Sequence, residues 1–154
     1  MRLWDFALKV HARPGVEAVY LRLQDDHRQC VSFLLWRLWT VVEERAVDAR
    51  LLGDAALTAK GWEAAATLPL RGVRRRLKTP VTAIDAAGQA ALREAIKAAE
   101  LQSERLLLEA LETLTPAPSG AVQDLDRGLM AAALAWGGTP APPALLRVLA
   151  DAAG

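Results

Sequence analysis

The sequence predicts an all-α protein, an irregular bundle of about seven helices around a central apolar helix at about residues 30–45. Apolar residues recur at helical spacing along nearly the whole chain, and no segment alternates apolar and polar residues as a half-buried β-strand does. Proline and glycine divide the chain into segments of helical length. Because the segment at residues 30–45 has no polar face, we expect the other helices to surround it.

The breaks between these segments define the expected helices in order. The first helix ends at Pro14-Gly15, and Pro14 also suits the first turn of the second helix. The pair Gly53-Asp54 is typical of a stop followed by a cap, Pro69 of the start of a short basic helix, and Asp85 of the N-cap of a long helix. The expected helices cover residues 3–12, 14–23, 30–45, 55–66, 70–78, 86–114, 121–136 and 144–152.

Large apolar side chains at helical spacing define the expected core. The two tryptophans of the central helix supply much of its area, since aromatic side chains bury more surface than aliphatic ones. The residues expected in the core are Trp4, Phe6, Leu8, Tyr20, Leu23, Phe33, Trp36, Trp39, Trp62, Leu92, Ile96, Leu106 and Leu111.

Length and composition limit the classes of protein to consider. A chain of 154 residues with 53% hydrophobic and 24% charged residues is expected to fold as a single helical domain, residues 1–154. The net charge of +1 gives no overall field that would attract nucleic acid or a membrane. The one cysteine, Cys30, cannot form an intramolecular disulfide, and with only two histidines it cannot make a usual zinc site. We therefore expect no metal and no cofactor.

The N-terminal segment and the most apolar window indicate where the protein works. The first residues lack the apolar stretch of a signal peptide, since Asp5 and Lys9 interrupt them. The window from Val31 to Val42 is short for a membrane span and contains Arg37. We therefore expect a cytoplasmic protein without a membrane span.

The expected binding site is a basic helix face. Arg71, Arg74, Arg75 and Lys78 follow one another at positions i, i+3, i+4 and i+7, which places them on one side of a helix. Arginine side chains bind phosphates and carboxylates bidentately, so this face suits an anionic ligand or an acidic protein surface. In the alternative interpretation the face lies against glutamates of the long helix at residues 86–114.

Three further charged residues are candidates for a pocket or for salt bridges. Arg37 lies within the most apolar helix, where it either reaches the bundle edge or pairs with an acid such as Asp5, Asp25 or Glu63. Glu100 and Glu104 lie one turn apart on the long helix. They are not expected to hold a metal, because neither histidine occurs in a Glu-x-x-His motif.

Several stretches of the sequence resemble a family of short proteobacterial proteins of unknown function. The resemblance covers roughly residues 3 to 115. It implies a bacterial, cytoplasmic, helical protein and assigns no catalytic residue. The stretches that carry it are Leu3-Trp4-Asp5-Phe6-Ala7, residues 11–17, residues 21–25, Leu34-Leu35-Trp36, residues 70–78 and residues 97–104.

These observations leave three functional hypotheses. The first is a small regulatory or adaptor protein that binds another protein through the basic face. The second is a binder of a small anionic ligand, such as a nucleotide, an acyl carrier or a lipid head group, at the same arginines. The third is an enzyme that uses Asp25 with His27 and Glu100 with Glu104. Nucleic acid is not an expected partner, and the alanine-rich long helix would suit pairing between copies of the chain.

Overall fold

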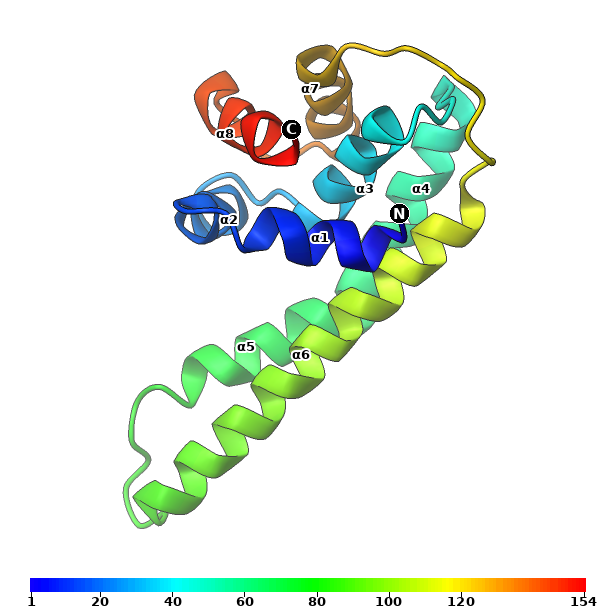
Figure 1. Ribbon diagram of the computed structural model, residues 1–154. Helices are drawn as coiled ribbons and strands as arrows, with labels where there is room; N and C mark the ends of the chain where they lie inside the picture. Colours follow the sequence, from blue (N-terminus) through cyan, green and yellow to red (C-terminus); the bar gives the residue numbers. More distant parts are fainter.

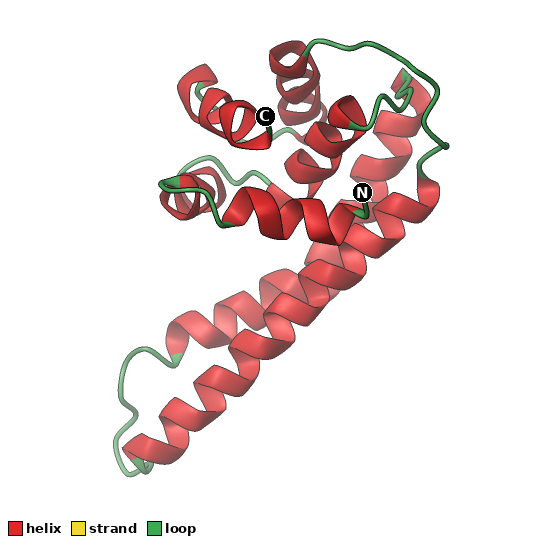
Figure 2. Ribbon diagram, viewed as in Figure 1, coloured by secondary structure: helices red, strands yellow, loops and turns green.

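The computed structural model describes residues 1–154 and is helical throughout, without a strand, as the sequence predicts (Figures 1 and 2). Segments α4, η1 and α5 follow one another without a break, so the eight α-helices and the π-helical segment form seven rods. No helix is both long enough and apolar enough to cross a membrane. The elements are α1 (Leu3–His11), α2 (Val16–Asp25), α3 (Val31–Val42), α4 (Ala49–Trp62), η1 (Glu63–Thr67), α5 (Leu68–Arg76), α6 (Ala86–Leu114), α7 (Leu125–Trp136) and α8 (Pro143–Ala153).

The molecule consists of a helical body and a projecting arm. We define the arm as α5, the connection at residues 77–85, and the half of α6 that lies beside α5. Figure 1 shows the arm extending well away from the other helices. Helix α5 packs only against α6 and the adjoining η1 segment. The other half of α6 belongs to the body, where it packs against α1, α3 and α4.

Helix α3 forms the centre of the body, which confirms the prediction of a central apolar helix. All residues from Val31 to Val41 are buried. The side chains of Trp36 and Trp39 are fully buried, and each indole N–H is nevertheless satisfied. Trp36 Nε1 donates to Thr115 Oγ1 at 2.8 Å, and Trp39 Nε1 donates to the carbonyl oxygen of Met1 at 2.9 Å. Buried indoles of this kind need such partners.

The predicted core is confirmed in the body and wrong on the outer surfaces. Leu92 is 52% exposed because its half of α6 has no helical neighbour except α5, and Leu106 is 43% exposed because it lies on an outer side of α6. Leu8, 47% exposed, lies on the outer side of α1. The remaining candidates are buried (Phe6, Leu23, Phe33, Trp36, Trp39 and Leu111) or partly buried (Trp4, Tyr20, Trp62 and Ile96).

Two predicted breaks are wrong, because Gly53 and Pro69 both lie inside helical structure. Helix α4 begins at Ala49, with Asp48 as the N-cap: Asp48 Oδ1 accepts from Leu51 N at 2.7 Å. Proline lacks an amide donor and its ring clashes with the carbonyl four residues earlier. A π-helical turn, in which Leu68 N donates to the carbonyl oxygen of Glu63, lies immediately before Pro69, and the helix continues through the proline. The predicted N-cap Asp85 is confirmed, since its Oδ2 accepts from Gly88 N at 2.6 Å.

Candidate functional site

The π-helical turn directs three polar side chains toward α6. Glu63, Thr67 and Arg71 follow one another at intervals of four residues and are all buried. In a regular α-helix, side chains four residues apart point in slightly different directions, because four residues make more than one full turn. A π-helical turn contains more residues and therefore compensates for part of this rotation. Thr67 Oγ1 lies 2.9 Å from Ser103 Oγ, which joins the end of η1 to α6. The base of the arm is therefore held by polar contacts rather than by apolar packing alone.

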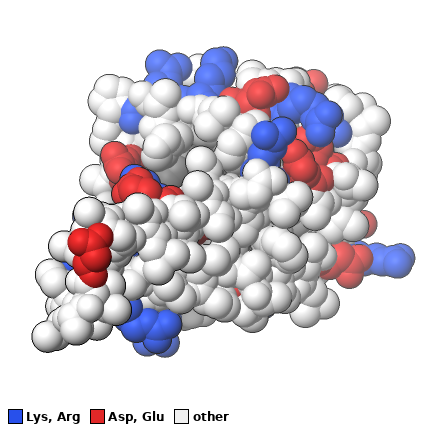
Figure 3. All heavy atoms as spheres, turned by 90° about the horizontal axis from the view of Figure 1, so that it is seen from below, with Lys and Arg blue, Asp and Glu red and all other residues white.

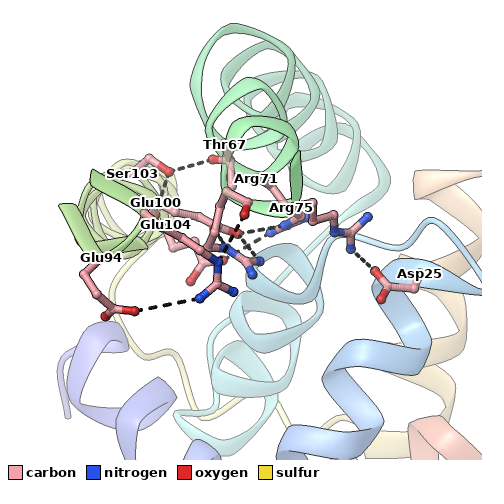
Figure 4. Close-up of polar contacts among 10 residues, drawn as sticks. Asp25, Thr67, Arg71, Arg75, Glu94, Glu100, Ser103 and Glu104 are labelled. Carbon is pink, nitrogen blue, oxygen red and sulfur yellow. Dashed lines mark hydrogen bonds and ion pairs between the residues drawn. The ribbon is translucent and has the colours of Figure 1, made fainter. Parts of the chain in front are cut away.

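Arg71 is the centre of this cluster (Figure 4). Its Nε donates to Glu100 Oε1 at 2.8 Å, and its Nη2 donates to Glu104 Oε1 at 3.3 Å. Arg74 donates to the same carboxylate of Glu100 through Nε and Nη2. The side chains of Arg71 and Glu100 are only 8% and 9% exposed, so this is a buried ion-pair cluster. Glu100 and Glu104 thus lie in salt bridges, one of the two roles that the sequence suggested.

The four residues of the predicted basic face lie in different surroundings. The guanidinium groups of Arg71 and Arg74 are occupied by Glu100 inside the cluster. Arg75 is exposed and reaches across to Asp25 of α2, and Lys78 is exposed beyond the end of α5. The alternative interpretation, in which the basic face lies against glutamates of the long helix, therefore describes two of the four residues.

Burial and the neighbouring arginines shift the pKa values of the carboxyl groups in this cluster. Burial raises the pKa of Glu104 to about 7, although Arg71 acts in the opposite direction. Burial likewise raises the pKa of Glu63, which has no ion-pair partner, against the charge of Arg71 and a hydrogen bond from Cys30. For Glu100, burial is outweighed by hydrogen bonds from Arg74 and Arg71, so its pKa is lowered. Glu104 can therefore gain or lose a proton near neutral pH.

Sequence reasoning did not assign Glu63, Cys30 and Tyr20 to this site. Burial, reinforced by the charge of Glu63, raises the pKa of the Cys30 thiol well above its ordinary value, so the thiol stays protonated. Burial and the charge of Glu104 raise the pKa of Tyr20, whose hydroxyl group has no hydrogen-bond partner. The four-residue spacing of Glu63, Thr67 and Arg71 in the sequence indicates that the three side chains lie on one face of a continuous helix. The expected break at Pro69 concealed it.

Arg37 lies apart from this cluster, and the prediction that it reaches the bundle edge or pairs with an acid is wrong. It is buried in α3, where Nη1 donates to Thr40 Oγ1 at 2.9 Å and Nη2 donates to Gln123 Oε1 at 2.5 Å. Burial lowers the pKa of its guanidinium group. Neutral oxygens from its own helix and from the segment before α7 replace the expected carboxylate.

Two surface hollows lie away from the arginine cluster. One, of about 340 Å³, is lined by residues of α7 and α8 that include Met130 and Arg147. The other, of about 380 Å³, lies between α4 and the end of α6, next to Leu51 and Pro116. Neither hollow is lined by a residue of the predicted basic face. Neither hollow therefore supports the hypothesis that these arginines line a pocket for a small anionic ligand.

Comparison with known proteins gives one result. The model of a family described as "Protein of unknown function (DUF2390)" matches residues 2–111. The chain belongs to this family. The match spans α1 to α5 and most of α6, so it includes the whole arginine–glutamate cluster and the whole arm. Searches of curated proteins and of solved structures gave no match.

Proposed function

We propose that this DUF2390 protein is a small bacterial adaptor that binds an acidic surface of another protein through the end of its arm. The observation that carries the proposal is the projection of the arm away from the body (Figure 1). A helical hairpin that touches the body beyond its base only through the exposed Arg75–Asp25 pair contributes little to the core, whereas it presents side chains to a partner from a rigid support.

Arg75 and Lys78 are the proposed contact residues. Both are exposed, Arg75 in the last turn of α5 and Lys78 just beyond its end, and the only internal partner of Arg75 is the exposed carboxylate of Asp25. Exposed ion pairs contribute little free energy, about 0–1 kcal/mol, so a partner carboxylate can replace Asp25 at small cost. Arg71 and Arg74 would then act as positioning residues, because their pairs with Glu100 hold α5 against α6.

The net charge and the single cysteine fit an acidic partner and a cytoplasmic location, which we include in the proposal. The net charge of +1 means that an acidic partner would be attracted by the local arginines and lysine rather than by the whole molecule. The only cysteine, Cys30, is buried and unpaired, which suits the reducing cytoplasm.

Charge reversal tests the proposal. The double variant Arg75→Glu, Lys78→Glu is used as bait beside the wild type in a lysate of the native host, and bound proteins are identified by mass spectrometry. The matched control is Arg50→Glu, Arg127→Glu, which changes the net charge equally at exposed positions of α4 and α7. We expect an acidic protein to be recovered with the wild type and the control but not with the arm variant. Equal recovery with all three baits would exclude the arm as the contact surface.

A further inference from the structure

A second surface of the arm is apolar and faces away from the body. In α6, Leu92, Ala99 and Leu106 are spaced by seven residues and form one row along the helix. Leu70 of α5 and Leu77, which follows the last residue of α5, have the same spacing. Ile96 lies between Leu92 and Ala99 and is partly buried between the helices. We call these six residues the apolar arm face: Leu70, Leu77, Leu92, Ile96, Ala99 and Leu106.

Contacts with the body establish which way these rows face. On α5, Arg75 reaches Asp25 of α2, and on α6 the guanidinium group of Arg105 lies 5.5 Å from the ring centre of Trp4 of α1. Those residues therefore mark the side of the hairpin that faces the body. The rows of leucines project from the opposite flank of each helix, because they are rotated away from these residues around the helix axis.

The α6 row of the apolar arm face is unpartnered and carries no charged side chain, whereas on α5 Arg74 lies between Leu70 and Leu77 and is bound to Glu100. Leu92, Ala99 and Leu106 are all exposed, and no other helix of the chain covers them. The residues of α6 beside this row are alanine, glycine and glutamine: Gly88, Ala91, Ala95, Ala98 and Gln102. Figure 3, which shows the molecule from below, displays a broad area without charged atoms and with charged side chains mainly around its margins.

We infer that this face binds a second copy of the chain, with the two arms antiparallel about a two-fold axis. An isologous interface requires one surface that complements itself, and the uncharged leucine and alanine row of α6 does so without opposing like charges. The alanines beside the rows allow close approach of helices. The two-fold axis also brings a positive charge at the margin of one copy close to a negative charge at the margin of the other.

Arg76 and Glu109 are these marginal charges. Arg76 lies near the tip of the arm on the outer edge of α5, is exposed, and makes no ion pair within the chain. Glu109 lies in the part of α6 that belongs to the body, beside the row that ends at Leu106. It pairs only with Arg105, four residues before it. In an antiparallel dimer the tip of one arm lies over the place where the other arm joins its body, so each Arg76 approaches Glu109 of the second copy.

The size of the face predicts a dimer of moderate affinity. From Leu92 to Leu106 the helix is about 21 Å long, and two packed helices give a face about 20 Å wide. A contact of this size buries on the order of 1,000 Å² in total, which is near the lower limit for a specific interface. We therefore expect dissociation in the micromolar range.

Sedimentation velocity of the purified, full-length protein tests this inference, because no other protein is then present to cover the face. The wild type is measured from about 1 to about 200 µM, a range that spans the expected dissociation constant. Leu92→Glu is expected to weaken dimerisation at least about tenfold, because it buries a charge in the interface. The matched control is Leu101→Glu, since Leu101 is 53% exposed and Leu92 is 52% exposed. Leu101 lies one turn before Arg105 and therefore on the body-facing flank of the same helix.

A charge exchange tests the antiparallel arrangement. Arg76→Glu and Glu109→Arg should each weaken dimerisation, and the double variant should restore it because the pair is re-formed with its charges reversed. A wild type that stays monomeric over the whole range would overturn the inference, as would equal loss in the Leu92 and Leu101 variants. A double variant as weak as the single ones would overturn the antiparallel pairing. Circular dichroism of each exposed-site variant confirms that the fold is intact.

Discussion

Arg71 Nε lies 2.8 Å from Glu100 Oε1, and both side chains are more than nine-tenths buried. This pair connects the base of α5 to the middle of α6, where the arm leaves the body. Because Arg74 also binds Glu100, one carboxylate holds two successive turns of α5. The arm is therefore fixed in direction, as a surface presented to a partner requires.

Removing the arginine of this pair should destabilise the protein strongly. Arg71→Met leaves the buried Glu100 and the partly buried Glu104 with only Arg74 to compensate their charges, and breaking a buried ion pair in this way typically costs about 3–5 kcal/mol. Urea denaturation followed by circular dichroism measures the free energy of unfolding. Arg50→Met serves as the control, since Arg50 is 90% exposed and its pair with Asp54 should contribute at most about 0.5 kcal/mol. Similar losses in both variants would contradict a buried cluster.

The raised pKa of Glu104 should make stability depend on pH. Burial raises its pKa to about 7 in the folded protein, against an ordinary value of 4.5. Between these two values the folded state binds more protons than the unfolded state, so the stability that the protonated group provides is lost as pH rises toward 7. Glu104→Gln should therefore stabilise the protein by about 1–3 kcal/mol at pH 8 and by little at pH 4.5.

The measurement for Glu104 is the difference in unfolding free energy between wild type and variant across this pH range. Glu94→Gln provides the control, because Glu94 is exposed on the same helix and lies outside the cluster. A difference for Glu104→Gln that is constant from pH 4.5 to pH 8 would show that the group does not titrate as described.

Gly128 should not tolerate a side chain. A Cβ atom at this position would lie 3.0 Å from Arg37 Nη2 and 3.2 Å from Val41 Cγ2. Arg37 is buried and held by Thr40 and Gln123, so it cannot move aside freely. We expect Gly128→Ala to lower the melting temperature, with a loss of about 1–2 kcal/mol. Gly53→Ala should raise the melting temperature and add up to about 1 kcal/mol to the free energy of unfolding, because Gly53 lies in α4 with open space around it. The same sign for both substitutions would refute this packing.

Trp36 should be among the most sensitive core positions. Its side chain is fully buried and its indole N–H donates to Thr115 Oγ1. Trp36→Ala should cost about 3–5 kcal/mol in chemical denaturation. Leu57→Ala, at a position 70% exposed, should change stability by at most about 0.5 kcal/mol. A tolerated Trp36→Ala would place α3 outside the core.

The helical class, the central position of α3 and the extent of α6 could be predicted from the sequence. Each depends on a local signal that tertiary structure did not override. The absence of a polar face indicated burial of the segment containing Trp36 and Trp39, and Asp85 marked the start of α6 correctly. The complementary charges of Arg71 and Glu100 were also visible, but only as one of two interpretations.

The remaining features depend on contacts that sequence periodicity does not encode. Pro69 indicated a break, yet the π-helical turn accommodates it within one rod. Leu92 and Leu106 have the spacing of core residues, but the structure exposes them, because periodicity shows which face of a helix is apolar and not what covers it. The assignment of an acid to Arg37 failed for a similar reason, since its partners Thr40 and Gln123 are neutral.

Site-specific photo-cross-linking in the native host tests most directly whether the end of the arm contacts another protein. A photoreactive residue is placed at Thr79, which is exposed beside Lys78, and for comparison at Val122, which is 91% exposed in the loop before α7. We predict an adduct with a different, acidic protein from position 79 but not from position 122, and its loss when Arg75 and Lys78 are both changed to glutamate. Absence of such an adduct at position 79, or its persistence after the charge reversal, would contradict the proposed function.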